Sequence, residues 1–180
     1  MEPLLDVFFW ATIATATIVL EIVVFISRRK HRRIVYALSG ISAIILFEVP
    51  RFIIPLLPQP TIGLNPNIAK IFGGVIFAIG MSVMIVAFLQ LMKAKRKDWK
   101  LQTSGVYGIV RHPMYLGDVL WALGWSILFN ALYALALTPL WFFLRYSIAV
   151  LEEEKLVEKY GDIYEIYMQK VRKRMIPYII

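Results

Sequence analysis

The chain has 180 residues, of which 59% are hydrophobic and 18% are charged, and its mean hydropathy is +0.68. Soluble domains average about 25% charged residues, and a globule of this size cannot bury so much apolar surface. These numbers exclude a soluble globular domain and a disordered chain, so we expect an integral membrane protein.

Residue types that support other classes of function are scarce. Cysteine is absent and the only histidines are His31 and His112. This excludes disulfide scaffolds, thiol nucleophiles and cysteine-based metal sites, and we expect no metal. The formal net charge of +8 could indicate a nucleic-acid partner. No separate basic domain is available to hold one, so we expect no nucleic acid and attribute the charge to membrane topology.

Five segments are long and apolar enough to span a bilayer, which requires about 20 mostly apolar residues. They cover about residues 4–27, 34–57, 68–92, 113–129 and 131–150. The first lacks a basic leader and is expected to be a permanent helix, not a signal peptide. Only Asn130 separates the last two, so we expect a tight helical hairpin. The sequence therefore predicts an all-α integral membrane protein with five transmembrane helices and a cytoplasmic C-terminal helix, in one membrane domain over residues 1–180.

Lysine and arginine are distributed asymmetrically between the predicted spans. Segments 28–33, 93–111 and 151–180 hold 17 of the 20, and segment 58–67 holds none. Because basic loops stay in the cytoplasm, we expect the N-terminus outside and the C-terminus in the cytoplasm. Residues 93–117 and 151–180 are then the predicted cytoplasmic catalytic elements.

Charged side chains within the spans are costly, so each one needs a role. Glu21, Asp118 and Arg145 lie at comparable depths, about 8–9 Å below the inner boundary at 1.5 Å per residue. They form either one charged cluster or three separate snorkelling or helix-pairing residues. Glu48 and Arg51 are three residues apart and predict a local pair toward the outer leaflet, without a catalytic role.

The densest group of polar and aromatic residues is segment 103–117, with the sequence TSGVYGIVRHPMYLG. Pro113 suits the first position of a helix, whose start offers free amides to an anionic group such as a carboxylate. Acidic residues 152–154 follow the fifth span, where we expect an amphipathic helix to begin, with a break at Gly161. That tail either lies against the membrane or folds back over the core. The structural alternatives are an interfacial loop with anchoring tyrosines and an ordinary helix N-terminal charge preference.

Together these segments resemble the isoprenylcysteine carboxyl methyltransferase family, which is related to membrane phospholipid methyltransferases. The pattern is G-V-Y-x-x-x-R-H-P-x-Y-x-G, then E-E-x-x-L-x-x-x-[aromatic]-G-x-x-Y-x-x-Y and a closing Pro, over about residues 100–180. The matching positions are Gly105, Val106, Tyr107, Arg111, His112, Pro113, Tyr115, Gly117, Glu152, Glu153, Leu156, Tyr160, Gly161, Tyr164, Tyr167 and Pro177. Membrane sterol reductases carry a similar RHPxY. The Glu pair and the aromatic tail therefore distinguish the methyltransferase family from these reductases.

The resemblance implies S-adenosyl-L-methionine as the cofactor, bound at the cytoplasmic face without a Rossmann domain. It also implies a lipophilic small-molecule or lipidated substrate that enters from the bilayer, among membrane lipids. By motif, the expected cofactor-binding residues are Lys100, Leu101, Gln102, Tyr107, His112, Pro113, Met114, Tyr115 and Glu152. The residues expected to serve catalysis are Arg111, Arg145 and Glu153.

One departure from the family concerns the methyl acceptor. Its eukaryotic members have an arginine four residues before the Glu pair, where this chain has Ile148, and Arg145 lies one turn earlier. The expected function is carboxyl methylation of a prenylcysteine-like acceptor. The alternatives are phospholipid amine N-methylation, NADPH-dependent reduction of the sterol type and a non-enzymatic membrane protein. The methyltransferase hypothesis requires Tyr115 and Glu152 to border the same pocket.

Overall fold

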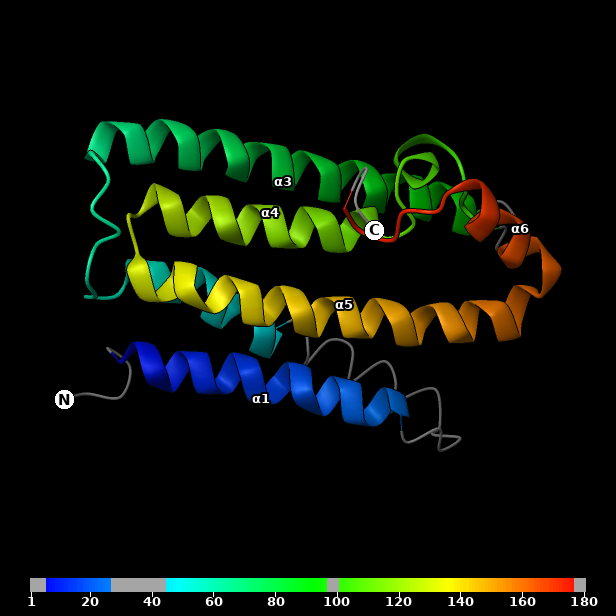
Figure 1. The fold of residues 1–180 in the computed structure, drawn as a ribbon, viewed down its shortest axis with the longest axis horizontal. Coiled ribbons are helices and arrows are strands. Elements are labelled where there is room, and N and C mark those ends of the chain that lie inside the picture. The colour runs from blue at the N-terminus through cyan, green and yellow to red at the C-terminus, as the bar shows by residue number, and fades with distance from the viewer. Residues whose placement is uncertain (1–5, 27–44, 97–100, 177–180) are drawn as a thin grey trace.

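The computed structural model describes residues 6–26, 45–96 and 101–176, and this part of the chain is helical, with one isolated β-bridge between Thr61 and Ala131. Its helical elements are α1 (Val7–Ile26), a helical segment over residues 45–53, η2 (Ile54–Leu56), α3 (Pro66–Arg96), η3 (Gly105–Gly108), α4 (Pro113–Leu128), α5 (Leu132–Tyr160) and α6 (Asp162–Lys170). The four long helices lie side by side in the order α3, α4, α5, α1, and α6 covers one end (Figure 1). The all-helical fold class is therefore confirmed.

Two helices of the described part are long and apolar enough to cross a membrane, over Pro66–Ala94 and Leu132–Tyr160. A shorter apolar stretch covers Val7–Val23. Helices thus occur where the first, third, fourth and fifth spans were predicted. Residues 34–44 of the second predicted span lie outside the described residues, as does His31.

The fifth helix is longer than predicted. α5 continues past residue 150 to Tyr160, so the predicted new helix starting at Leu151 is wrong. No glycine or proline stands between Pro139 and Gly161, and charged side chains at a membrane boundary do not interrupt backbone hydrogen bonding. Residues 152–154 therefore lie inside α5, and the helix N-terminal preference does not explain them. The break at Gly161 is confirmed, with a positive φ of 54°.

α3 and α4 pack backbone to backbone through glycines spaced seven residues apart, at positions 73 and 80 of α3 and 117 and 124 of α4. A Cβ atom added at Gly80 or Gly117 would overlap the backbone of the opposite helix. Small residues allow such close approach where helices associate inside a membrane. This packing fixes the position of α4, which begins at Pro113 inside the RHPxY motif.

Five charged residues of the predicted spans form one largely buried network. Arg51 Nη1 donates to Asp118 Oδ1 at 2.8 Å and to Glu48 Oε2 at 3.0 Å. Arg145 donates to Asp118 Oδ2 through Nε at 2.9 Å and to Glu48 Oε1 through Nη2 at 2.6 Å. Glu21 lies 3.8 Å from Arg145 Nη1. The cluster hypothesis is confirmed, and so is the local pair of Glu48 and Arg51. The expectation that this pair stands apart from the cluster is wrong, because Arg51 also binds Asp118 and Glu48 also binds Arg145.

Candidate functional site

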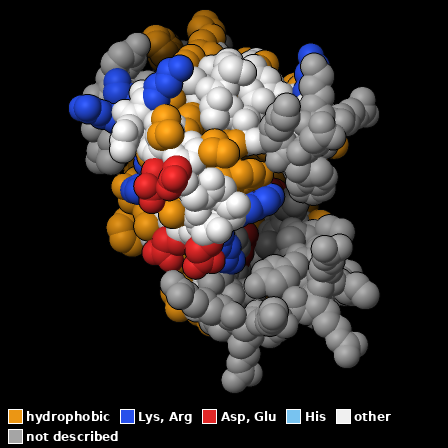
Figure 2. All heavy atoms as spheres, turned by 90° about the vertical axis from the view of Figure 1, so that its right-hand side faces the viewer, with side chains coloured by type: hydrophobic (Ala, Val, Ile, Leu, Met, Phe, Trp, Pro, Cys, Tyr) orange, Lys and Arg blue, Asp and Glu red, His pale blue; other side chains and the backbone are white. Residues whose placement is uncertain are grey.

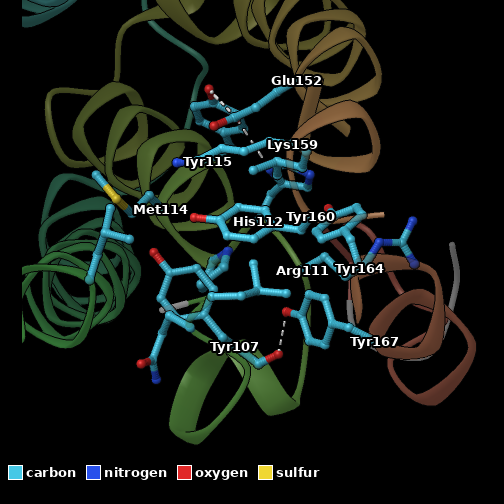
Figure 3. A pocket seen from close by; sticks show the side chains of 15 residues that line it. Tyr107, Arg111, His112, Met114, Tyr115, Glu152, Lys159, Tyr160, Tyr164 and Tyr167 are labelled. Carbon is cyan, nitrogen blue, oxygen red and sulfur yellow. Dashed lines mark hydrogen bonds and ion pairs between the residues drawn. The ribbon is translucent and has the colours of Figure 1, made fainter. Parts of the chain in front are cut away.

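A cavity of about 390 Å³ opens between segment 101–115, the last turns of α5, and α6. Figure 3 shows side chains from these three parts of the chain pointing toward one another around it. The lining residues are Leu91, Leu101, Gln102, Tyr107, Arg111, His112, Pro113, Met114, Tyr115, Glu152, Leu156, Lys159, Tyr160, Tyr164 and Tyr167. A mostly apolar and aromatic wall with a few polar groups is typical of a small-molecule site.

The cavity gathers most of the residues that the motifs singled out. Those from the predicted cofactor set are Leu101, Gln102, Tyr107, His112, Pro113, Met114, Tyr115 and Glu152. Lys100, the ninth member, lies outside the described residues. Of the residues assigned to catalysis, Arg111 lines the cavity, whereas Arg145 and Glu153 do not.

The two motif segments meet through a direct hydrogen bond. Tyr115, in the first turn of α4, donates its hydroxyl to Glu152 Oε2 of α5 at 2.9 Å. The His112 ring stacks on the Tyr115 ring, with centroids 5.5 Å apart and planes 3° apart. The Glu152 side chain is 38% exposed, so its carboxylate remains accessible from the cavity. Tyr115 and Glu152 therefore border the same pocket, as the methyltransferase hypothesis requires.

Glu153 faces away from the cavity because successive helical residues point about 100° apart. Its buried carboxylate accepts hydrogen bonds from Arg111 Nε at 2.7 Å and from Arg174 Nε at 2.9 Å. His112 Nε2 lies 3.1 Å from the same carboxylate. These partners occupy Glu153, so its position is that of an organising residue behind the cavity wall and not of a group facing a ligand.

The chain after α6 folds back over the molecule and does not lie apart from it. The backbone amides of Arg111 and His112 donate to the carbonyls of Lys173 and Arg174, at 2.9 and 2.8 Å. Within α6, the Tyr167 hydroxyl donates to the Tyr107 carbonyl at 2.7 Å. Of the two tail arrangements that the sequence left open, the one that folds back over the core is confirmed.

Sequence reasoning missed three residues of this region. Leu91 and Lys159 line the cavity, and Arg174 holds Glu153. The two basic residues were attributed to topology, and Leu91 was one apolar residue among many in a predicted span. A helical wheel of α5 would have placed Lys159 on the same face as Glu152, seven residues earlier.

Three tyrosines of the cavity, Tyr107, Tyr164 and Tyr167, are hydrogen-bonding groups and not bases. Burial, together with the charge of Glu152, raises the pKa of Tyr107 to about 12. Burial also raises the pKa of Tyr164 and of Tyr167. Their phenol groups therefore stay protonated at neutral pH, where they can donate hydrogen bonds and stack against a ligand.

Charged side chains gather at the end of the molecule that holds the cavity, as the view onto that end shows (Figure 2). Exposed acidic residues there include Glu154, Glu158 and Asp162. This end is suited to contact with water, whereas many exposed residues of α3 are large and apolar, such as Phe72, Val75 and Ile79.

Comparison with known proteins gives a family match over residues 68–163, more than half of the chain, to the family described as Phospholipid methyltransferase. The match includes α3, α4, α5 and most of the cavity lining. No solved structure gives a significant match.

Curated relatives match the same part of the chain. A protein-S-isoprenylcysteine O-methyltransferase of Schizosaccharomyces pombe is 41% identical over 88 residues, which cover 47% of this chain and 37% of the relative. One from Xenopus laevis is 33% identical over 144 residues, covering 76% of this chain and 48% of the relative. A Delta(14)-sterol reductase of Mus musculus is 36% identical over 86 residues, covering 44% and 20%. The chain thus spans less than half the length of each of these relatives.

Proposed function

Because the chain belongs to the phospholipid methyltransferase family, we propose that it is an integral membrane methyltransferase that uses S-adenosyl-L-methionine. The acceptor that we propose is a prenylcysteine-like carboxylate, by analogy with the relatives named protein-S-isoprenylcysteine O-methyltransferase. The observation that carries the proposal is the 2.9 Å hydrogen bond between Tyr115 and Glu152, which joins the two motif segments at one cavity wall.

The residues of the cavity fit this cofactor. A ribose diol requires a hydrogen-bond acceptor, and the accessible carboxylate of Glu152 is one. The carboxylate of the cofactor suits the free backbone amides at the start of α4, where Pro113 is the first residue. The rings of Tyr107 and Tyr160 offer faces for a planar base. The resemblance to the isoprenylcysteine family supports the same residues as the cofactor set.

When bound, the cofactor supplies a methyl group already activated by a sulfonium. The protein then has to bind the cofactor and the acceptor, orient them in line and exclude water. Positioning and desolvation of this kind lower the barrier to methyl transfer. An acceptor carboxylate is ionised at neutral pH and needs no general base. The raised pKa of Tyr107 agrees with this division of roles, because a neutral phenol binds without taking up a proton.

We propose that Arg145 meets an acceptor from the membrane side. Its guanidinium lies 5.5 Å from the centre of the Tyr115 ring. Asp118 and Glu48 hold its Nε and Nη2, and the longest of its three ion-pair contacts is that of Nη1 to Glu21, at 3.8 Å. We propose that Nη1 of Arg145 turns to the acceptor carboxylate. Arg145 then serves in place of the arginine that the eukaryotic enzymes have at the position of Ile148. Arg111 lines the cavity and is held there by Glu153, which lies behind the wall.

For the membrane arrangement, we propose five spans with the N-terminus outside and the cavity and C-terminus on the cytoplasmic side. The two long apolar helices and the basic segments support it. The cofactor then enters from water, and the lipid chain of the substrate stays in the bilayer beside Tyr115.

The first test is binding of S-adenosylhomocysteine to detergent-purified protein, by calorimetry. We expect saturable binding, and no binding at millimolar ligand would contradict the proposal. A labelled cofactor, offered with a prenylcysteine carboxylate and with a phospholipid amine, then identifies the acceptor. Methylation of the amine alone would replace the carboxylate with the second acceptor class, which the family description itself favours.

The similarity to a sterol reductase supports a second candidate function, NADPH-dependent reduction. Ligand-induced protection from thermal unfolding distinguishes the two candidate functions. Protection by S-adenosylhomocysteine and none by NADPH supports the methyltransferase, and the reverse result supports the reductase.

A further inference from the structure

We propose that Glu153 is a positioning residue that latches α6 over the cavity through Arg174, and that this latch sets the rate at which the cofactor leaves. The inference rests on the proposed function for its ligand. Segment 171–176, here called the C-terminal strap, joins α6 to Glu153 and to the RHPxY motif.

α6 has the contacts of a lid. One of its faces carries Tyr164 and Tyr167, which are buried and line the cavity. A neighbouring, outward face carries Ile163 and Ile166, each 64% exposed. The lid therefore contacts the rest of the molecule through its aromatic face and through the attachments at its two ends.

The two ends of the lid are fastened differently. The near end joins α5 through Gly161, whose φ of 54° and ψ of −134° are favourable for glycine alone, and around which a side chain would meet nothing within 4 Å. This is an open joint that can absorb a change in direction. The far end continues into the C-terminal strap, which is hydrogen-bonded at several points.

The strap is fixed at Glu153. Arg174 donates to the Glu153 carboxylate through Nε and to the Tyr146 hydroxyl through Nη1, at 2.9 and 2.5 Å. Arg111 donates to the same carboxylate and, through Nη1, to the Val171 carbonyl at 2.8 Å. One buried carboxylate therefore holds Arg174, which belongs to the strap, and Arg111, which donates to the strap's Val171 carbonyl.

Loss of the carboxylate charge would release this arrangement. Arg111 and Arg174 would then lie close together without a shared anion, and a buried cation deprived of its partner is strongly destabilised. The strap is the part that can move away, because α4 is fixed by its glycine contacts with α3. Glu152 stays in place, since it belongs to α5.

The test measures release of S-adenosylhomocysteine from the purified 180-residue chain after rapid dilution, for wild type, Glu153→Gln, Arg174→Gln and the double variant. Removing a charged hydrogen bond gives about tenfold faster release in each single variant. The double variant should release the ligand no faster than the faster single variant, because both changes open the same latch. Glu158→Gln and Arg172→Gln remove the same charges from exposed positions nearby and should leave the rate unchanged.

Turnover at saturating cofactor separates a latch from a catalytic carboxylate. A latch predicts a raised KM for the cofactor with kcat kept or increased. A fall in kcat with an unchanged rate of ligand release overturns the proposal, and so do equal release rates in all folded variants. Multiplicative effects on the release rate in the double variant also overturn it.

Hydrogen exchange makes the outcome independent of the ligand. Amides of residues 162–176 should exchange faster in Glu153→Gln and Arg174→Gln than in the two control variants. Unchanged exchange in both folded variants refutes the latch even where the ligand binds. Absence of ligand binding by the wild type, with faster exchange in the variants, would instead contradict the proposed function and leave the latch standing. If Glu153→Gln does not fold, Arg174→Gln and Tyr146→Phe carry the same comparison.

Discussion

Substitution of Glu152 by glutamine tests the assignment of the cavity most sharply. The change keeps the shape of the side chain and an oxygen that can still accept from the Tyr115 hydroxyl, now 2.9 Å from Oε2. It removes the negative charge offered to the ligand. A hydrogen bond to a charged group contributes about 1.5–3 kcal/mol, and 1.4 kcal/mol is tenfold in Kd.

Solvent screening reduces this figure, because the Glu152 side chain is 38% exposed. We therefore expect S-adenosylhomocysteine to bind about tenfold more weakly to Glu152→Gln, at the low end of that range. The matched control is Glu154→Gln, two residues along the same helix and exposed, which should change Kd less than twofold, or about 0.4 kcal/mol. Titration calorimetry of both purified variants measures the difference. Equal effects of the two substitutions would refute the assignment of Glu152 to the cofactor.

Arg145→Ala should lower methyl transfer more than cofactor affinity, measured as specific activity of the folded fraction; unchanged specific activity with lower stability would indicate a purely structural residue. It should also destabilise the protein by about 3–5 kcal/mol in thermal or denaturant unfolding, because Asp118 loses one of two buried cations. Gly80→Val should abolish folding that size-exclusion chromatography detects, since a Cβ there overlaps the α4 backbone, whereas Gly74→Ala meets only ordinary contacts and should be tolerated. Ligand affinity should show no titration of Tyr107 between pH 7 and 9, because its raised pKa, about 12, keeps the neutral donor present throughout; weaker binding as pH rises in that window, absent from Tyr107→Phe, would contradict this.

The cavity could be predicted because its wall residues belong to two compact motifs. The family resemblance, carried by Tyr115 and His112 in one motif and by Glu152 in the other, required a shared pocket, and the structure places Tyr115 and Glu152 within a 2.9 Å hydrogen bond. Local sequence also indicated the break at Gly161, since glycine tolerates the positive φ found there.

Features that depend on tertiary placement were not predictable from spacing. The pairing of Arg51 with Asp118 joins residues 67 positions apart, and nothing local to either residue indicates it. Glu152 and Glu153 are adjacent and of the same residue type. Only the direction of each side chain shows that Glu152 lines the cavity and that Glu153 holds the strap. The end of α5 was misplaced because hydropathy marks the membrane boundary, whereas a helix ends where its backbone hydrogen bonding ends.

The central claim is that the RHPxY segment, α5 and α6 enclose a single cofactor site, and a density map of the protein determined with saturating S-adenosylhomocysteine tests it most directly. We predict ligand density inside the cavity, in contact with Glu152 and Tyr107. Density outside this cavity, or an empty cavity at saturating ligand, would contradict the claim.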